Sequence, residues 1–176
     1  MGKTTKDMLF ISHGDGSFLF RRHFAAPRQL MWDVWTKPEH LKHWWGPKGF
    51  TVKHADMRLA PGGRFHYGMA SPQGHEMWGL FHYRELQAPE RIVLVNGFAD
   101  PQGNATKPPF PGWPSEMLNT MTLVEELGGT ALFNHVVAIN CTPEEKAVFV
   151  EGHRSMEGGY GGTMEQLDAY LATVRP

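Results

Sequence analysis

The stretch TPEEKAVFVEGHRSMEGGYGGTMEQLDAYL, residues 142–171, decides the fold because it predicts one long C-terminal helix. Thr142 suits the N-cap, Pro143 suits the first turn, and Glu145 completes a capping box. Apolar or small residues then recur at helical spacing on one face: Phe149, Gly152, Met156, Gly159 or Tyr160, Thr163, Leu167 and Leu171. A helix from residue 143 to about 173 spans roughly 45 Å at 1.5 Å per residue, which is long enough to cover a sheet.

Four glycines lie within five residues of this stretch, in the sequence GGYGG at 158–162. They do not form a phosphate-binding loop, because Thr163 follows Gly162 directly, without the lysine of a Walker motif, and no strand precedes them. The missing strand also excludes a dinucleotide-binding fingerprint. Since each glycine inside a helix costs about 0.5–1 kcal/mol relative to alanine, the glycines need another explanation.

Two interpretations of these glycines stay open. Either they separate two helices, or one helix continues and Gly159 lets it lie close to the sheet, with Tyr160 directed into a cavity. The apolar pattern keeps its phase across the glycines, which favours the continuous helix. On that interpretation, Gly159→Leu is expected to disrupt packing or to occlude the cavity.

The residues before the long helix predict a sheet interrupted by two short helices. The helices are expected over residues 26–36 and from Pro38 to just before Gly46. Short connections and the Gly128-Gly129 turn favour antiparallel hairpins over parallel βαβ units. The fold class is therefore α+β, with a curved antiparallel sheet of about seven strands in the order strand, two helices, six strands and final helix. The strands are expected at residues 17–24, 50–57, 64–70, 75–86, 91–98, 115–127 and 130–139.

No internal repeat or linker divides the chain, so we predict a single domain over residues 17–176. Residues 1–16 have weak periodicity and are expected to be a poorly anchored lead-in segment. Residues 99–114 are rich in proline and glycine and are expected to be irregular.

The composition excludes several classes of function. A net charge of −1 gives no electrostatic reason to expect nucleic acid or a membrane surface as partner. Cys141 is the single cysteine, so no disulfide framework is expected. The chain has no apolar run of the length that spans a membrane, and its first residues lack the apolar core of a signal peptide, so a cytoplasmic location is expected. Ten methionines, six tryptophans and eleven phenylalanines suit an adaptable apolar cavity.

The sequence contains no recognisable catalytic motif. Its ten histidines show no metal-ligand spacing, so we expect neither a metal nor a cofactor. Cys141 is interpreted as a small structural residue beside the helix start. Four side chains on strands or on the long helix are the candidates for acid–base chemistry, and each is more simply explained as a structural residue: Glu76, Glu116, His135 and His153.

Four segments together resemble the SRPBCC (START-like) superfamily, in the branch related to the C-terminal domain of the activator of the heat-shock protein 90 ATPase. The resemblance covers residues 17–173 approximately and implies the helix-grip fold, in which a curved sheet grips the long helix around a cavity. The segments are RHFAAPRQLMWDVWTKPEHLKHWWGPKGFTV (22–52), APGGRF (60–65), YRELQAPERIV (83–93) and GGYGGTMEQLDAYL (158–171).

Members of this superfamily include lipid carriers, hormone receptors, polyketide cyclases and chaperone activators, so the fold does not fix the function. Our leading hypothesis is binding of a small, largely apolar molecule between the sheet and the helix, without catalysis. One alternative is a cyclase- or hydrolase-like enzyme that uses the same cavity. Another is a co-chaperone-like activator of the heat-shock protein 90 ATPase. An exposed edge strand would also allow a homodimer.

The ligand-binding hypothesis requires an enclosed space above about 100 Å³, which is already below the usual size of ligand pockets. Bulky side chains interleaved with a few polar ones are the expected lining. These residues are Trp35, Trp45, Tyr67, Met69, Trp78, Trp113, Met117, Asn119, Phe133, His135, Met156 and Tyr160.

Overall fold

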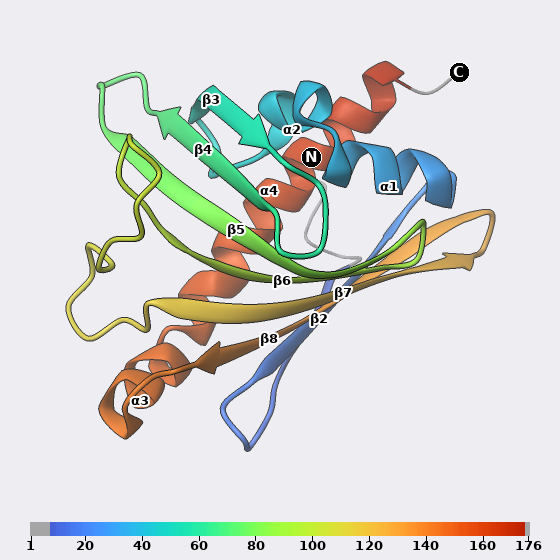
Figure 1. The fold of residues 1–176 in the computed structure, drawn as a ribbon. Coiled ribbons are helices and arrows are strands. Elements are labelled where there is room, and N and C mark those ends of the chain that lie inside the picture. The colour runs from blue at the N-terminus through green and yellow to red at the C-terminus, as the bar shows by residue number, and fades with distance from the viewer. Residues whose placement is uncertain (1–7, 175–176) are drawn as a thin grey trace.

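A computed structural model describes residues 8–174 and shows an eight-stranded antiparallel sheet curved around a long helix (Figure 1). The strand order is β1-β2-β8-β7-β6-β5-β4-β3. This arrangement confirms the α+β helix-grip fold. The elements are β1 (Met8–Ser12), β2 (Phe18–Phe24), α1 (Arg28–Thr36), α2 (Pro38–Trp44), β3 (Thr51–Met57), β4 (Arg64–Ala70), β5 (Glu76–Gln87), β6 (Arg91–Phe98), β7 (Glu116–Glu126), β8 (Gly129–Ile139), α3 (Pro143–Glu151) and α4 (His153–Val174).

The additional strand, β1, lies in the segment that the sequence suggested was a lead-in. It pairs with β2, placing Phe10 opposite Phe20, and the Phe10 ring stacks on Phe18 with a centroid distance of 4.7 Å. The expectation of a poorly anchored segment is therefore wrong for Met8–Ser12, because these residues complete one edge of the sheet. Residues 1–7 of the same segment lie outside the described residues.

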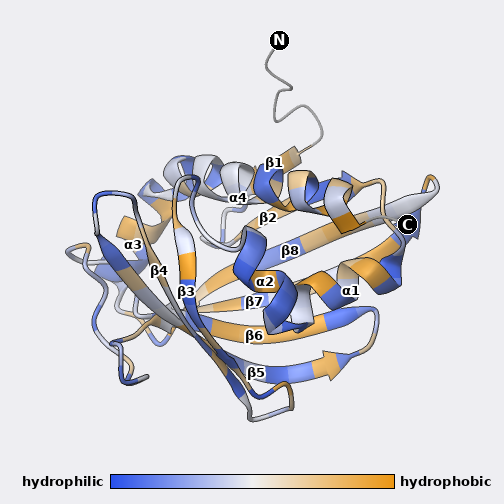
Figure 2. Cartoon of the chain, turned by 90° about the horizontal axis from the view of Figure 1, so that it is seen from above, coloured by the Kyte–Doolittle hydropathy of each residue, from blue (hydrophilic) through white to orange (hydrophobic). Residues whose placement is uncertain are grey.

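The helices α1, α2 and α4 lie on one side of the sheet, as the view from above shows (Figure 2). Burial along β7 alternates residue by residue from Glu116 to Leu123, as expected for a strand with one covered face. Within residues 8–174, no helix is long and apolar enough to cross a membrane.

Contacts at two glycines show which residues of β4 and β5 face the helix. A Cβ atom on Gly79 would lie 2.3 Å from the Tyr67 hydroxyl oxygen, so the Tyr67 ring covers Gly79 on the concave face. A Cβ atom on Gly68 would lie 2.6 Å from the Trp78 ring, so Trp78 covers Gly68 on the opposite, convex face. Because side chains alternate along a strand, these two contacts set the facing of β4 and β5.

The C-terminal helical region begins as the sequence predicts. The Glu145 backbone N–H donates to Thr142 Oγ1 at 3.1 Å, and the Thr142 N–H donates to Glu145 Oε2 at 2.9 Å, forming the capping box. The region is nevertheless divided at Gly152 into α3 and α4, so the expectation of one uninterrupted helix is wrong. A Cβ atom on Gly152 would lie 2.6 Å from the Trp113 ring, so the indole packs directly on the backbone at the division.

The glycine cluster lies inside α4, which continues through it without a break. No atom of the surrounding structure lies within 4 Å of a Cβ built on Gly158, Gly159 or Gly162, and Gly159 is exposed. The interpretation that Gly159 permits close approach to the sheet is therefore wrong. Gly161 is the buried member of the cluster.

Alanine at position 159 is therefore expected to stabilise the protein. Gly159→Ala should raise the free energy of unfolding by about 0.5–1 kcal/mol, because alanine restricts the unfolded chain and its methyl group meets open space. Urea unfolding followed by circular dichroism measures the change. Gly152→Ala is the matched control and should be destabilising, because its methyl group meets Trp113. A loss of stability in Gly159→Ala would contradict this account.

Candidate ligand-binding site

A cavity of about 20 Å³ lies between the concave face of the sheet and α4. That volume accommodates about one water molecule and is far below the roughly 300–1,000 Å³ of typical ligand pockets. It is also below the roughly 100 Å³ that our hypothesis requires, so the expectation of a preformed, ligand-sized cavity is not met. Its walls are Trp35, Trp45, Phe81, Leu94, Asn96, Asn119, Met121, Asn134 and Tyr160.

Three asparagines form a hydrogen-bonded chain across the otherwise apolar concave face. Asn134 Nδ2 on β8 donates to Asn119 Oδ1 on β7 at 2.9 Å, and Asn119 Nδ2 donates to Asn96 Oδ1 on β6 at 2.6 Å. Asn119 and Asn134 are 4% and 2% exposed. We call these three residues the asparagine chain. Buried amides are expensive unless hydrogen-bonded, so each member depends on its neighbour.

Three buried polar atoms of residues that line this cavity have no hydrogen bond of standard geometry within residues 8–174: Asn134 Oδ1, Trp35 Nε1 and Trp45 Nε1. Trp45 Nε1 forms no hydrogen bond of standard geometry, although its interaction with the Tyr67 hydroxyl slightly favours the ionised phenol. An unsatisfied buried donor or acceptor costs about 1–3 kcal/mol. The cavity lining therefore includes one unpartnered acceptor, Asn134 Oδ1, and one unpartnered donor, Trp35 Nε1, whereas the Trp45 N–H interacts with Tyr67.

The phenols beside the cavity are neutral at ordinary pH. Burial raises the pKa of Tyr67 to about 12. Burial, reinforced by the neighbouring Tyr67, also raises the pKa of Tyr160. No Asp, Glu, Lys or Arg side chain is among the described residues that line the cavity. The site therefore offers hydrogen bonds and apolar contact, and it has no formal charge with which to hold an ion.

The twelve predicted cavity residues occupy three different places. Trp35, Trp45, Asn119 and Tyr160 line the cavity. Tyr67, Met69 and Met117 are buried nearby on the concave face, and Met156 of α4 packs against the same core. The remaining four lie elsewhere: Trp78, Phe133 and His135 on the convex face, and Trp113 against Gly152 and Phe149.

Five cavity residues were missed by sequence reasoning. They are Phe81, Leu94, Asn96, Met121 and Asn134. The hairpin between β7 and β8 held a usable signal, because the pairing of Glu126 with Gly129 places Asn134 opposite Met121. Counting back from that turn would have put Asn134, rather than Phe133 or His135, on the concave face.

The four acid–base candidates do not form a common site. Glu76 is exposed and bonds to Lys53 and to Trp78 Nε1 on the convex face. Glu116 accepts a hydrogen bond from Asn140. His135 bonds to the Ser17 hydroxyl at 3.0 Å, and His153 is buried among phenylalanine rings. Within residues 8–174, no three His, Cys, Asp or Glu side chains are placed to hold a metal ion, and Cys141 is a partly buried free thiol.

His153 joins β1 to α4 and makes stability depend on pH. Its Nδ1 lies 2.9 Å from Ser12 Oγ, and its ring packs edge-on against Phe18 and Phe149. Burial lowers the pKa of His153, and the Gly16 backbone opposes this effect more weakly. The folded protein therefore resists protonation below about pH 6.5, where the unfolded chain binds a proton more readily. Stability from this group is present above that pH and is lost as the pH falls.

We therefore expect His153→Gln to flatten the dependence of stability on pH. The free energy of unfolding should fall less between pH 7.5 and 5.5 in the variant than in the wild type. Urea midpoints at the two pH values measure this difference. His75→Gln, at an exposed position, should keep the wild-type slope. Equal slopes for His153→Gln and wild type would contradict the role assigned to burial.

A curved antiparallel sheet closed over a C-terminal helix, with a small interior space between them, defines the START-like helix-grip class. Within this class, the chain belongs to the family described as Activator of Hsp90 ATPase homolog 1-like protein, whose sequence profile matches residues 25–172. This match confirms the resemblance to the SRPBCC superfamily. No curated protein sequence is significantly similar to the chain.

Solved structures share the fold at low sequence identity. A Mycobacterium smegmatis protein is 24% identical, with a TM-score of 0.75, over 96% of this chain and 98% of its own. An Arthrobacter aurescens protein is 24% identical, with a TM-score of 0.78, over 94% and 91%. An AHSA1-like protein from Aeromonas hydrophila is 17% identical, with a TM-score of 0.64, over 89% and 92%. At these identities the likeness shows the fold alone.

Proposed function

We propose that this protein binds a small molecule between the sheet and α4, and that the ligand carries a hydrogen-bonding group. The observation that supports this proposal is the pair of unpartnered atoms, Asn134 Oδ1 and Trp35 Nε1, on the wall of one interior cavity. A ligand amide or hydroxyl group can donate to the first and accept from the second. The remaining walls, including Phe81 and Leu94, suit an apolar body.

Ligand binding at this place requires the cavity to enlarge. Met121 is unbranched and has three rotatable side-chain bonds, so it adapts to different shapes. Tyr160 is only partly buried, and its ring lies beside Phe20 with a centroid distance of 4.7 Å. Movement of the Tyr160 ring away from the cavity adds its volume to the space available. The largely apolar ligand that the sequence predicts is thereby refined to a ligand with a polar end.

Native mass spectrometry of the protein purified from its own host tests this proposal. We expect a co-purifying small molecule in the wild type and a reduced amount in Asn134→Leu, which removes the unpartnered acceptor. Gln73→Leu removes an exposed amide and serves as the matched control. A wild-type mass without any adduct, or equal adduct in wild type and Asn134→Leu, would overturn the proposal.

No comparable observation supports the two alternative functions, a cyclase- or hydrolase-like enzyme and a co-chaperone. The acid–base candidates are dispersed over separate faces, as described above, so they do not support a cyclase or hydrolase. The family description names an ATPase activator, but no feature of residues 8–174 marks a surface for a chaperone. Ligand binding is therefore the function that the geometry supports best.

A further inference from the structure

A second and larger pocket, of about 240 Å³, opens where β6 and β7 separate. The two strands pair as far as Asn96 with Met117. Beyond that point Gly97 and Phe98 pair with β5 on one side, and on the other side the Phe98 carbonyl accepts a hydrogen bond from the Thr106 backbone N–H at 3.0 Å. A Cβ atom on Gly97 would lie 2.6 Å from the Ser115 carbonyl oxygen, so glycine is required where the chain returns to β7. Among residues 8–174, Asn96 alone lines both this pocket and the interior cavity.

Ala105 and Thr106 line this pocket and directly follow a firmly held loop, residues 100–104. The Asp100 carboxylate accepts hydrogen bonds from the backbone N–H and the side-chain amide of Asn104, at 2.9 and 3.0 Å. Arg64 donates to the Gly103 carbonyl at 3.0 Å, and His66 bonds to the Asp100 carbonyl at the same distance. These contacts fasten the loop to the convex face of β4. The pocket is therefore built into the fold.

The pocket has a cationic side. Arg84 lies at a bulge in β5, where the pairing shifts between Tyr83–Leu94 and Glu85–Val93. Bulges redirect side chains and are frequent beside functional sites. Arg84 is exposed and makes no ion pair with any residue of 8–174. His82 lies two residues earlier and lines the same pocket, so two nitrogen donors are available to an anionic group.

The opposite side of the pocket is acidic and the middle is apolar. Through the pairs Asn96–Met117 and Leu80–Gly97, Glu116 on β7 lies level with Leu80 on β5. It is therefore two strands across and four residues along from Arg84, a backbone separation of roughly 16 Å that the two long side chains shorten from either end. One Glu116 oxygen accepts from Asn140 at 3.1 Å, which leaves the carboxylate with further capacity to accept hydrogen bonds. Leu80, Val95 and Phe98 provide apolar surface between the two charged sides.

We propose that this pocket binds a small, elongated molecule with a carboxylate at one end, an amine at the other and an apolar middle. The carboxylate meets Arg84 and His82, the amine meets Glu116, and the methylene groups lie on Leu80 and Val95. A pocket of 240 Å³ limits the occupant to a short chain. This site lies on the convex side and does not depend on the interior site proposed above.

Three matched probes test the proposal: 6-aminohexanoate, hexanoate and hexylamine. Each is titrated into isotopically labelled full-length protein while the amide signals of Gly97 and Thr106 are followed by NMR. We expect 6-aminohexanoate to bind several-fold more tightly than hexanoate or hexylamine. The Trp35 indole N–H signal should not move, which separates this site from the interior cavity. Absence of 6-aminohexanoate binding, or shifts at Trp35 without shifts at Gly97, would overturn the proposal.

Variants then assign the two ends of the ligand. Arg84→Gln should weaken 6-aminohexanoate binding at least tenfold, whereas Arg154→Gln, which removes an exposed charge from α4, should leave it unchanged. Glu116→Gln should reduce the affinity for 6-aminohexanoate to that for hexanoate. Equal effects of Arg84→Gln and Arg154→Gln would overturn the assignment of the carboxylate, and an unchanged affinity in Glu116→Gln would overturn that of the amine.

Discussion

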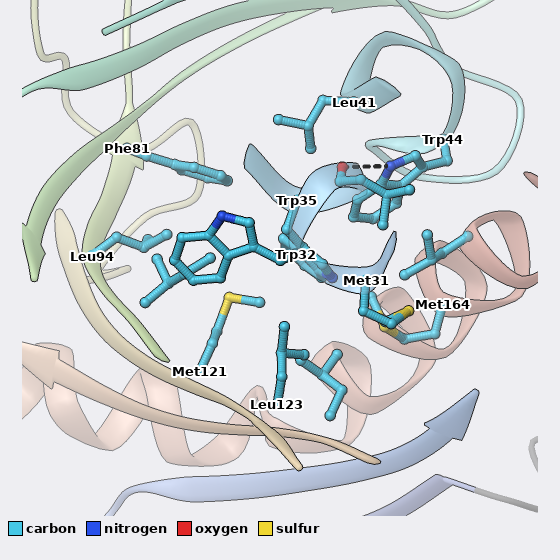
Figure 3. Close-up of a cluster of buried hydrophobic side chains, with 14 of the residues drawn as sticks. Met31, Trp32, Trp35, Leu41, Trp44, Phe81, Leu94, Met121, Leu123 and Met164 are labelled. Atoms are coloured by element: carbon cyan, nitrogen blue, oxygen red, sulfur yellow. Dashed lines mark hydrogen bonds between the residues drawn. The ribbon is translucent and has the colours of Figure 1, made fainter. Parts of the chain in front are cut away.

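Trp44→Ala is expected to lower the free energy of unfolding by about 3–5 kcal/mol, the range for removing a large aromatic side chain from a core. Trp44 is 2% exposed, and its indole lies edge-on to Trp35 with a centroid distance of 4.7 Å. Figure 3 shows Trp44 beside Leu41, with its N–H donating to a backbone oxygen of α1, the Val34 carbonyl, at 3.1 Å. The variant loses packing and leaves that carbonyl without this donor.

Urea unfolding of Trp44→Ala and Trp44→Phe separates the two losses. Phenylalanine retains most of the apolar contact but lacks the N–H, so Trp44→Phe should cost clearly less than Trp44→Ala. Since Trp35 lines the interior cavity and packs on Trp44, both variants should also change the Trp35 indole N–H signal in NMR spectra. Loss of less than about 1 kcal/mol in Trp44→Ala would contradict the central place of this residue in the core.

Local chemistry made the helix start and the last hairpin predictable. The capping box at Thr142 and Glu145 is read from four consecutive residues. The Gly128-Gly129 signal predicts the hairpin but not its register, because the turn is Leu127-Gly128 and Gly129 pairs with Glu126 as the first residue of β8. β1 was missed because its assignment depends on pairing with β2, a contact between residues 8–12 and 18–22 that no local pattern records. The division at Gly152 likewise depends on Trp113, which comes from a loop distant in sequence.

The candidate site was harder to predict for a geometric reason. A shift of one residue moves every strand side chain to the other face. The prediction placed the bulky residues of β8, Phe133 and His135, on the concave face, where the structure has Asn134 instead. The size of the cavity depends on how completely Trp35, Met121 and Tyr160 fill it, and composition does not determine side-chain packing. The asparagine chain could not be predicted locally, because its hydrogen bonds join residues of three neighbouring strands, β6, β7 and β8.

Asn119→Leu should lower the free energy of unfolding by about 2–4 kcal/mol, because it removes the middle of the asparagine chain and leaves both neighbours without a partner. Asn134 Nδ2 loses its acceptor in a fully buried position, and Asn96 Oδ1 loses its donor beside the convex pocket. Leucine has the branching of asparagine but a larger volume, so overpacking adds to the loss caused by the unpaired amides. Urea unfolding measures it.

The double variant Asn119→Leu/Asn134→Leu should be more stable than Asn119→Leu alone, because it also removes the stranded Asn134 amide and the acceptor that already lacks a partner. In native mass spectrometry the same double variant should carry no adduct. Recovery of stability together with loss of the adduct would mean that the asparagine chain is maintained at a cost to the core and acts in binding. A double variant less stable than the single one would instead make these amides structural, and the binding proposal would lose its supporting observation.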